Sequence, residues 1–173
     1  MLKPTFACLT LLAVVATAQP ALADGALFAT LGESVPFAGS ARQIGGTALI
    51  NVGVGLDLNN LKPLPLRNSV LFDYATGSAN GGSITNWGVG FGTRLSTPTY
   101  IGAAAFLYNV NVNQGSVIGS HNATSFGSNI YVGQRFISVP GGLSVGAQIT
   151  YRQLPVVNGI DSSGISFAVR GSL

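Results

Sequence analysis

Six charged residues have the types and spacing to form ion pairs inside a folded chain. Three arginines and one aspartate each lie near one end of a segment in which apolar residues alternate with small or polar ones, and all four fall among the small ones. A second aspartate and a fourth arginine could pair toward the other end. Buried charges are costly unless they are paired or hydrated, so one carboxylate among three guanidiniums predicts water or an anion beside them. The first group is Asp57, Arg94, Arg135 and Arg170, and the second is Asp73 and Arg152.

These six residues support two interpretations. They can be structural ion pairs that hold the inside of a fold together, or they can give weak anion selectivity to a narrow passage. Neither interpretation needs a cofactor, and we expect none.

The single histidine, His121, is the candidate for catalysis. It begins the stretch His121-Asn122-Ala123-Thr124-Ser125, and acids such as Asp161 belong to other parts of the chain. A serine nucleophile needs an adjacent, oriented base, so we expect this side chain to be solvated. The sequence holds no metal-ligand cluster, phosphate-binding glycine loop or nucleophile elbow. We therefore expect no enzymatic activity and no metal site.

Strands position these residues. From Ile50 to Leu58 every second residue is apolar, and Asn51, Gly53, Gly55 and Asp57 lie between them. Side chains on a strand alternate between its faces, and about 10 residues suffice to cross a bilayer as a tilted strand. The same pattern predicts eight strands, over residues 26–35, 46–61, 69–75, 85–95, 99–112, 125–136, 143–152 and 165–173.

The composition agrees with membrane-spanning strands. The mean hydropathy of the 173 residues is +0.45 and only 8% are charged, far below the ~25% of an ordinary soluble domain. After the first two dozen residues the chain has no apolar run of the length that a membrane helix needs. High hydropathy without such a run is typical of strands that face lipid on one side.

Residues 1–23 read as a secretory signal, with Lys3 at the start, an apolar stretch and Ala21-Leu22-Ala23 before the cleavage point. Residues 24–173 are then the barrel domain. Removal of the signal also removes Cys8, the only cysteine, so we expect no disulfide. The small net positive charge predicts no nucleic-acid partner.

The predicted connections alternate in length. Short turns are predicted at 62–66, 96–98 and 139–142, and longer loops at 36–42, 77–83, 113–123 and 154–163. Short periplasmic turns and longer external loops are expected of an outer-membrane barrel. We therefore predict an all-β fold, an eight-stranded antiparallel up-and-down transmembrane β-barrel.

Aromatic residues near the strand ends would form two girdles at the membrane interfaces, where amphipathic rings are favoured. All are expected to face lipid. The outer girdle would hold Tyr74, Trp87, Tyr108, Phe126 and Tyr151, and the periplasmic girdle Tyr100 and Phe136.

The predicted lumen is lined by many glycines, such as Gly53, Gly88, Gly90 and Gly133. They could allow a narrow, strongly coiled barrel to close. They could instead leave a lumen that holds water or a ligand. Eight strands enclose a space just wide enough for side chains, so the first interpretation is preferred.

The signal, the eight alternating segments and the apolar last strand resemble the small outer-membrane barrels of the OmpA transmembrane domain, OmpX and OmpW type. The resemblance implies residence in the cell outer membrane, contact with its lipid and lipopolysaccharide, and insertion by the barrel assembly machinery. Family members usually end in an aromatic residue. Here Ile165, Phe167 and Val169 keep the spacing, and Leu173 replaces the aromatic.

Three functions follow from this pattern. The first is a structural or narrow-channel outer-membrane protein without catalysis. The second is a secreted, soluble, lipocalin-like ligand carrier with its apolar face turned inward. The third is a lipid A-modifying enzyme: the PagL-type deacylases carry a His-x-Ser pair, but the spacing around His121 does not match it. The sequence does not determine the oligomeric state.

Overall fold

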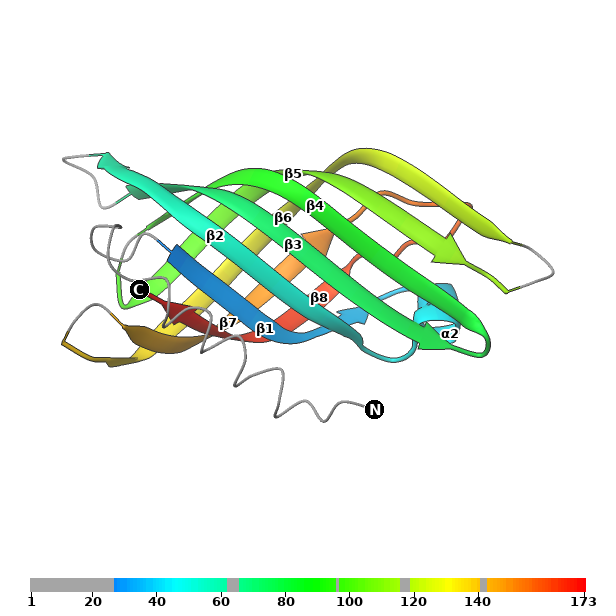
Figure 1. Ribbon diagram of the computed structural model, residues 1–173, viewed down its shortest axis with the longest axis horizontal. Helices are drawn as coiled ribbons and strands as arrows, with labels where there is room; N and C mark the ends of the chain where they lie inside the picture. Colours follow the sequence, from blue (N-terminus) through cyan, green and yellow to red (C-terminus); the bar gives the residue numbers. More distant parts are fainter. Residues whose placement is uncertain (1–26, 62–65, 96, 116–118, 141–142) are drawn as a thin grey trace.

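The computed structural model describes residues 27–61, 66–95, 97–115, 119–140 and 143–173. In this part of the chain it has eight strands and one short helix, α2 (Gly39–Gly45) (Figure 1). The predicted signal (1–23) and most of the predicted turn at 62–66 lie outside the described residues. The strands are β1 (Leu27–Pro36), β2 (Leu49–Leu61), β3 (Leu66–Ala79), β4 (Gly82–Leu95), β5 (Thr99–Asn113), β6 (Ser120–Ser138), β7 (Ser144–Gln153) and β8 (Gly164–Ser172).

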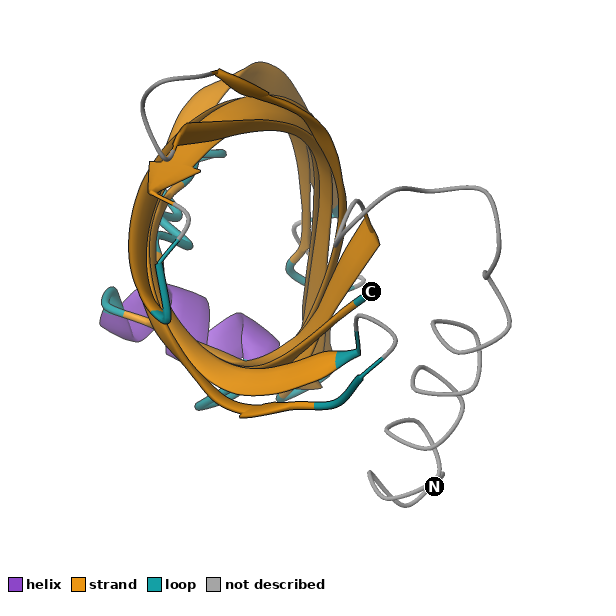
Figure 2. Ribbon diagram, turned by 90° about the vertical axis from the view of Figure 1, so that its left-hand side faces the viewer, coloured by secondary structure: helices purple, strands orange, loops and turns teal. Residues whose placement is uncertain are grey.

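The eight strands form a closed barrel in which each strand pairs with its neighbours in sequence (Figure 2). Every pairing is antiparallel, and β1 closes the barrel against β8. Leu31, for example, lies between Val52 of β2 and Val169 of β8. The predicted eight-stranded antiparallel up-and-down barrel is confirmed.

The predicted alternation holds along seven of the eight strands. On β4, Trp87, Val89 and Phe91 are exposed on the outside, whereas Asn86 and Arg94 are buried inside. On β2, Ile50 is exposed and Asn51 is buried. Alternation with a period of two residues thus gives a barrel with apolar side chains outside and small or polar side chains inside.

The orientation of β5 was predicted wrongly. Its inward residues are Tyr100, Phe106 and Tyr108, whereas Ile101 and Leu107 lie outside. Both faces of this strand are apolar, so its own alternation does not determine which face points into the lumen. Pairing with β4 does, because directly opposed residues share a face: Tyr108 opposes Gly88 and Phe106 opposes Gly90, and both glycines point inward.

The predicted loop at 77–83 is also wrong. β3 and β4 continue to Ala79 and Gly82 and are joined by Asn80 and Gly81, with φ of 50° and 77°. Asn-Gly with two positive φ values is the preferred two-residue hairpin turn. The proposed alternation of short and long connections therefore fails at this hairpin. The loop predicted at 113–123 is shorter too, since β6 begins at Ser120.

Apolar side chains are buried at the end of the barrel that carries α2. α2 begins in the stretch predicted as a loop at 36–42 and runs on to Gly45, and the N–H of Phe37 just before it donates to the carbonyl oxygen of Ser163 (2.9 Å) in the connection after β7. Within the described part of the chain, no helix has the length and hydropathy that crossing a membrane requires. The side chains buried at this end are Ala41, Leu49, Ile84, Val110, Val112, Leu154, Val157 and Ile160.

Candidate lumen site

The buried ion pair between Asp73 and Arg152 lies at the centre of the lumen. Both guanidinium Nε (3.1 Å) and Nη2 of Arg152 donate to Asp73 Oδ2. Nη2 also donates to Asn86 Oδ1 (2.7 Å) and Nη1 to Ser34 Oγ (3.2 Å). The pair proposed from the sequence is thus formed, and every nitrogen of the buried guanidinium has an acceptor.

Asp73 is bound from the other side by neutral groups. Asn51 Nδ2 donates to Oδ1 (2.8 Å), and the hydroxyl of Tyr108 donates to Oδ2 (2.6 Å). That hydroxyl also lies 3.1 Å from Asn129 Oδ1, and Ser166 Oγ donates to Asn51 Oδ1 at 2.9 Å. Charge-assisted bonds of this kind are the strong ones in a low-dielectric interior.

All eight strands contribute to this central network. A bond that joins opposite walls ties together strands that the backbone ladder joins only through their neighbours. The network therefore crosses the lumen with polar contacts and joins strands on opposite walls of the barrel. Its members, from β1 to β8, are Ser34, Asn51, Asp73, Asn86, Tyr108, Asn129, Arg152 and Ser166.

A second cluster surrounds Asp57 near the end of the barrel that carries Leu27 and Leu173. Arg94 Nη2 lies 2.6 Å from Asp57 Oδ2, and Arg67 Nη1 lies 3.6 Å from the same oxygen. Ser69 Oγ donates to Oδ1 at 2.5 Å. Arg67, which was not among the predicted lumen residues, thus joins the predicted pair. It lies two residues from Ser69 on β3 and so shares its inward face, which the sequence could have indicated.

The two other predicted arginines lie in the same half of the lumen without such an ion pair. Arg170 is 5% exposed, and its guanidinium lies 3.5 Å from the ring centre of Phe28 and 5.0 Å from that of Tyr100. Its Nη1 donates to Gln148 Oε1 (3.1 Å). Arg135 is only half-buried. Among the described residues, neither has a carboxylate within ion-pair distance.

Several inward glycines are covered by aromatic rings from neighbouring strands. A Cβ on Gly55 would lie 2.1 Å from Phe28 Cζ, and one on Gly133 would lie 2.2 Å from Tyr100 Cζ. Tyr131 covers Gly102 in the same way, and Phe106 and Tyr108 cover Gly90 and Gly88 on β4. At these five positions the glycines do not leave the wall bare, because the absence of a Cβ admits a flat ring against the backbone.

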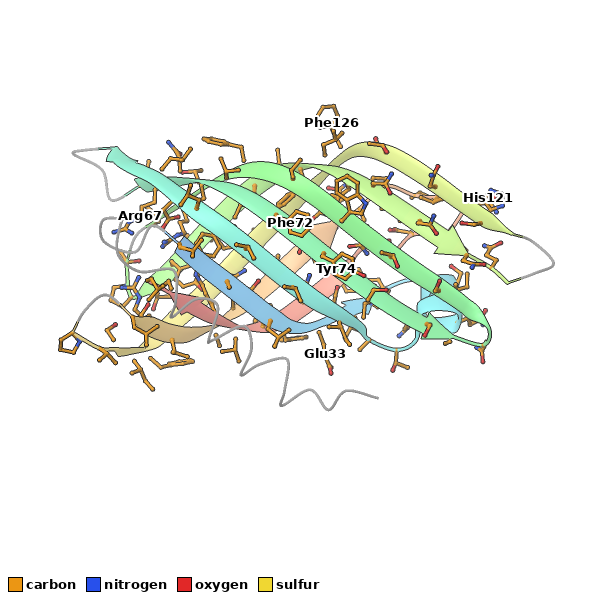
Figure 3. All side chains as sticks on the ribbon, viewed as in Figure 1. Glu33, Arg67, Phe72, Tyr74, His121 and Phe126 are labelled. Carbon is orange, nitrogen blue, oxygen red and sulfur yellow. The ribbon has the colours of Figure 1, made fainter. Side chains whose placement is uncertain are left out.

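Five of the seven predicted girdle aromatics lie on the outer surface, and two do not. Tyr100 and Tyr108, expected to face lipid, are 3% and 0% exposed inside the barrel, because β5 has the reversed orientation. Phe126 is 82% exposed and projects away from the barrel (Figure 3). Tyr74 is half-buried on the outside; the other outward residues are Trp87, Phe136 and Tyr151.

His121 lies on the surface at the start of β6, far along the barrel from Arg67 (Figure 3). It opposes Val112 of β5. Among the described residues, no serine or carboxylate makes a side-chain hydrogen bond or ion pair with it. The described chain also has no cluster of three or more metal-ligating side chains.

Comparison with known proteins identifies the fold. No protein-family model and no curated protein sequence matches the chain. The structure of Neisserial surface protein A (NspA) is similar, with a TM-score of 0.61 and 17% identity over 84% of this chain and 92% of that one. The N-terminal β-barrel domain of Pseudomonas aeruginosa OprF gives a TM-score of 0.51 and 10% identity over 86% and 96%. Both are small eight-stranded outer-membrane barrels.

Proposed function

We propose that this chain is an integral outer-membrane protein that acts as a sealed structural barrel. The observation that carries the proposal is the pairing of an apolar outer surface with a lumen crossed by hydrogen bonds from all eight strands. A protein of this kind contributes its outer surface and its loops to the membrane and conducts no solute.

The outer surface supports residence in a bilayer. Large apolar side chains such as Phe72, Val89, Phe91 and Val132 are exposed all around the barrel. Soluble monomers rarely expose apolar patches larger than a few hundred Å². The surface argues against the lipocalin-like carrier, whose apolar side chains would line the inside.

The lumen supports a sealed barrel over a narrow channel. The Asp73–Arg152 network crosses its centre, aromatic rings cover several of its glycines, and apolar side chains are buried beside α2 at one end. Ions would have to displace charge-assisted hydrogen bonds to pass. Lipid and lipopolysaccharide are the proposed surroundings, and the barrel assembly machinery the proposed route of insertion, with Phe167 and Val169 outward on the last strand.

Planar-bilayer recording on the purified protein tests the sealed barrel. We expect no conductance steps above those of detergent alone. Insertion must be established in the same preparation, by heat-modifiable gel mobility and by resistance of the strands to protease. Stable steps from protein that meets both criteria would overturn the sealed barrel in favour of the narrow channel.

The enzyme alternative has its own measurement. We expect the lipid A of cells that produce the protein to have the same mass spectrum as that of cells that do not. A change in acylation that His121→Ala abolishes would establish catalysis and contradict the proposal.

A further inference from the structure

Arg170 is a buried cation with incomplete polar contacts. Its Nη1 donates to Gln148, but its Nη2 is buried with no acceptor in the described chain. Phe28 and Tyr100 stabilise the guanidinium through cation–π contacts with their rings. Removing such a cation from water costs more than these contacts contribute, so its charge requires a further partner.

A cavity of about 40 Å³ lies against this side chain. A second buried polar atom without a partner borders the same cavity, the hydroxyl of Tyr131. Thr30 and Thr150 supply two more hydroxyls to its wall. Each of these groups can donate a hydrogen bond, so the wall of the cavity carries several donors beside the buried guanidinium of Arg170.

The charges around the cavity leave an excess of cations. Asp73 borders it too, but its charge is matched by Arg152, and both of its oxygens already accept hydrogen bonds. Asp57 is shared between Arg94 and Arg67. Two buried nitrogens of Arg94, Nε and Nη1, also lack an acceptor in the described chain. The half of the lumen that holds Arg170 is therefore electropositive.

We propose that this cavity binds a small monovalent anion of the halide class, chloride under physiological conditions. A water molecule needs about 10–15 Å³ of such space, so the cavity accommodates a halide with one or two waters. The anion accepts from Arg170 Nη2 and from the hydroxyl of Tyr131. It neutralises the buried guanidinium. The proposed sealed structural barrel does not itself require a bound ligand.

Bromide is the probe that tests this site directly. We expect crystals of the detergent-solubilised protein grown in sodium bromide to show an anomalous peak within hydrogen-bonding distance of Arg170 Nη2 and Tyr131 Oη. Density for water alone in the cavity would overturn the proposal. Bromide found at surface positions only would do so as well, since it would be an adventitious ion only.

A pair of tyrosine variants tests the site in solution. A ligand that binds only the folded state raises its stability by RT ln(1 + [L]/Kd), so at constant ionic strength the urea midpoint should be higher in bromide than in gluconate. Tyr131→Phe removes one donor and should lower the affinity for bromide about fivefold, which is the effect of losing one hydrogen bond. Tyr151→Phe, whose ring lies on the outer surface, should leave the bromide effect unchanged.

Two results in this second experiment contradict the site. One is an equal midpoint in bromide and gluconate for the parent protein. The other is an equal bromide effect in both tyrosine variants. Because Tyr131→Phe keeps the ring that covers Gly102, the variant retains the packing of the wall.

Discussion

Replacement of Arg152 by methionine should be among the most destabilising single changes in the barrel. Asp73 would keep its bonds from Asn51 and Tyr108 but lose the cation that neutralises it. Removing one member of a buried ion pair costs about 3–5 kcal/mol, because an uncompensated charge remains. Asn86 and Ser34 would also lose a donor.

The double variant distinguishes the ion pair from simple loss of packing. Asp73→Asn alone should cost a similar 3–5 kcal/mol, because the guanidinium is then left without its carboxylate. In the double variant no buried charge is left unpaired. Its cost should fall to about 2–3 kcal/mol, the value of the hydrogen bonds that remain unmade. The coupling energy in the cycle is then about 3 kcal/mol or more.

Urea unfolding in phospholipid vesicles measures these differences. Trp87, the single tryptophan of the chain, reports the transition from lipid to water. Arg42→Met is the matched control, since Arg42 is exposed on α2, and its effect should stay within about 0.5 kcal/mol. The reasoning fails if Arg152→Met behaves like the control, or if the double variant costs the sum of the single ones.

Further predictions concern the glycines. Gly133→Ala should cost about 1–3 kcal/mol, since its methyl group would overlap the ring of Tyr100; Gly171→Ala, which meets no atom within 4 Å, should be neutral in the same urea titration. If Gly133→Ala and Gly171→Ala had equal free energies of unfolding, contact with the Tyr100 ring would not be the reason for glycine at position 133. Gly81→Ala should cost about 1–2 kcal/mol because this residue has φ of 77°, and an unchanged midpoint would contradict the tight Asn80–Gly81 turn.

Alternation alone predicted the strands and the facing of most side chains. It works where one face is apolar and the other is not, as in Ile50–Leu58, because a shift by one residue would expose the wrong set. β5 lacks that contrast. Which of its faces points inward follows from its pairing with Gly88 and Gly90 of β4. The pattern of a single strand does not contain that information.

The contacts inside the lumen depend on register and strand tilt. Asp73 and Arg152 are 79 residues apart, and their meeting requires both to lie at one depth on different walls of the barrel. Parity places Asn51, Asn86 and Asn129 inside, but it does not show that they meet in one network. The Asn80–Gly81 hairpin is different, because the dipeptide itself is a turn signal and was sufficient to exclude a longer loop.

Quenching of Trp87 by brominated lipid tests the central claim most directly, because it needs no substitution. Trp87 lies on the outer wall, 45% exposed, opposite Tyr74 of β3. In vesicles of phospholipid brominated on its acyl chains we expect strong quenching, a blue-shifted emission and little effect of aqueous acrylamide. Emission that acrylamide quenches and bromolipid does not would show that this face meets water, and the barrel would not span a membrane as described.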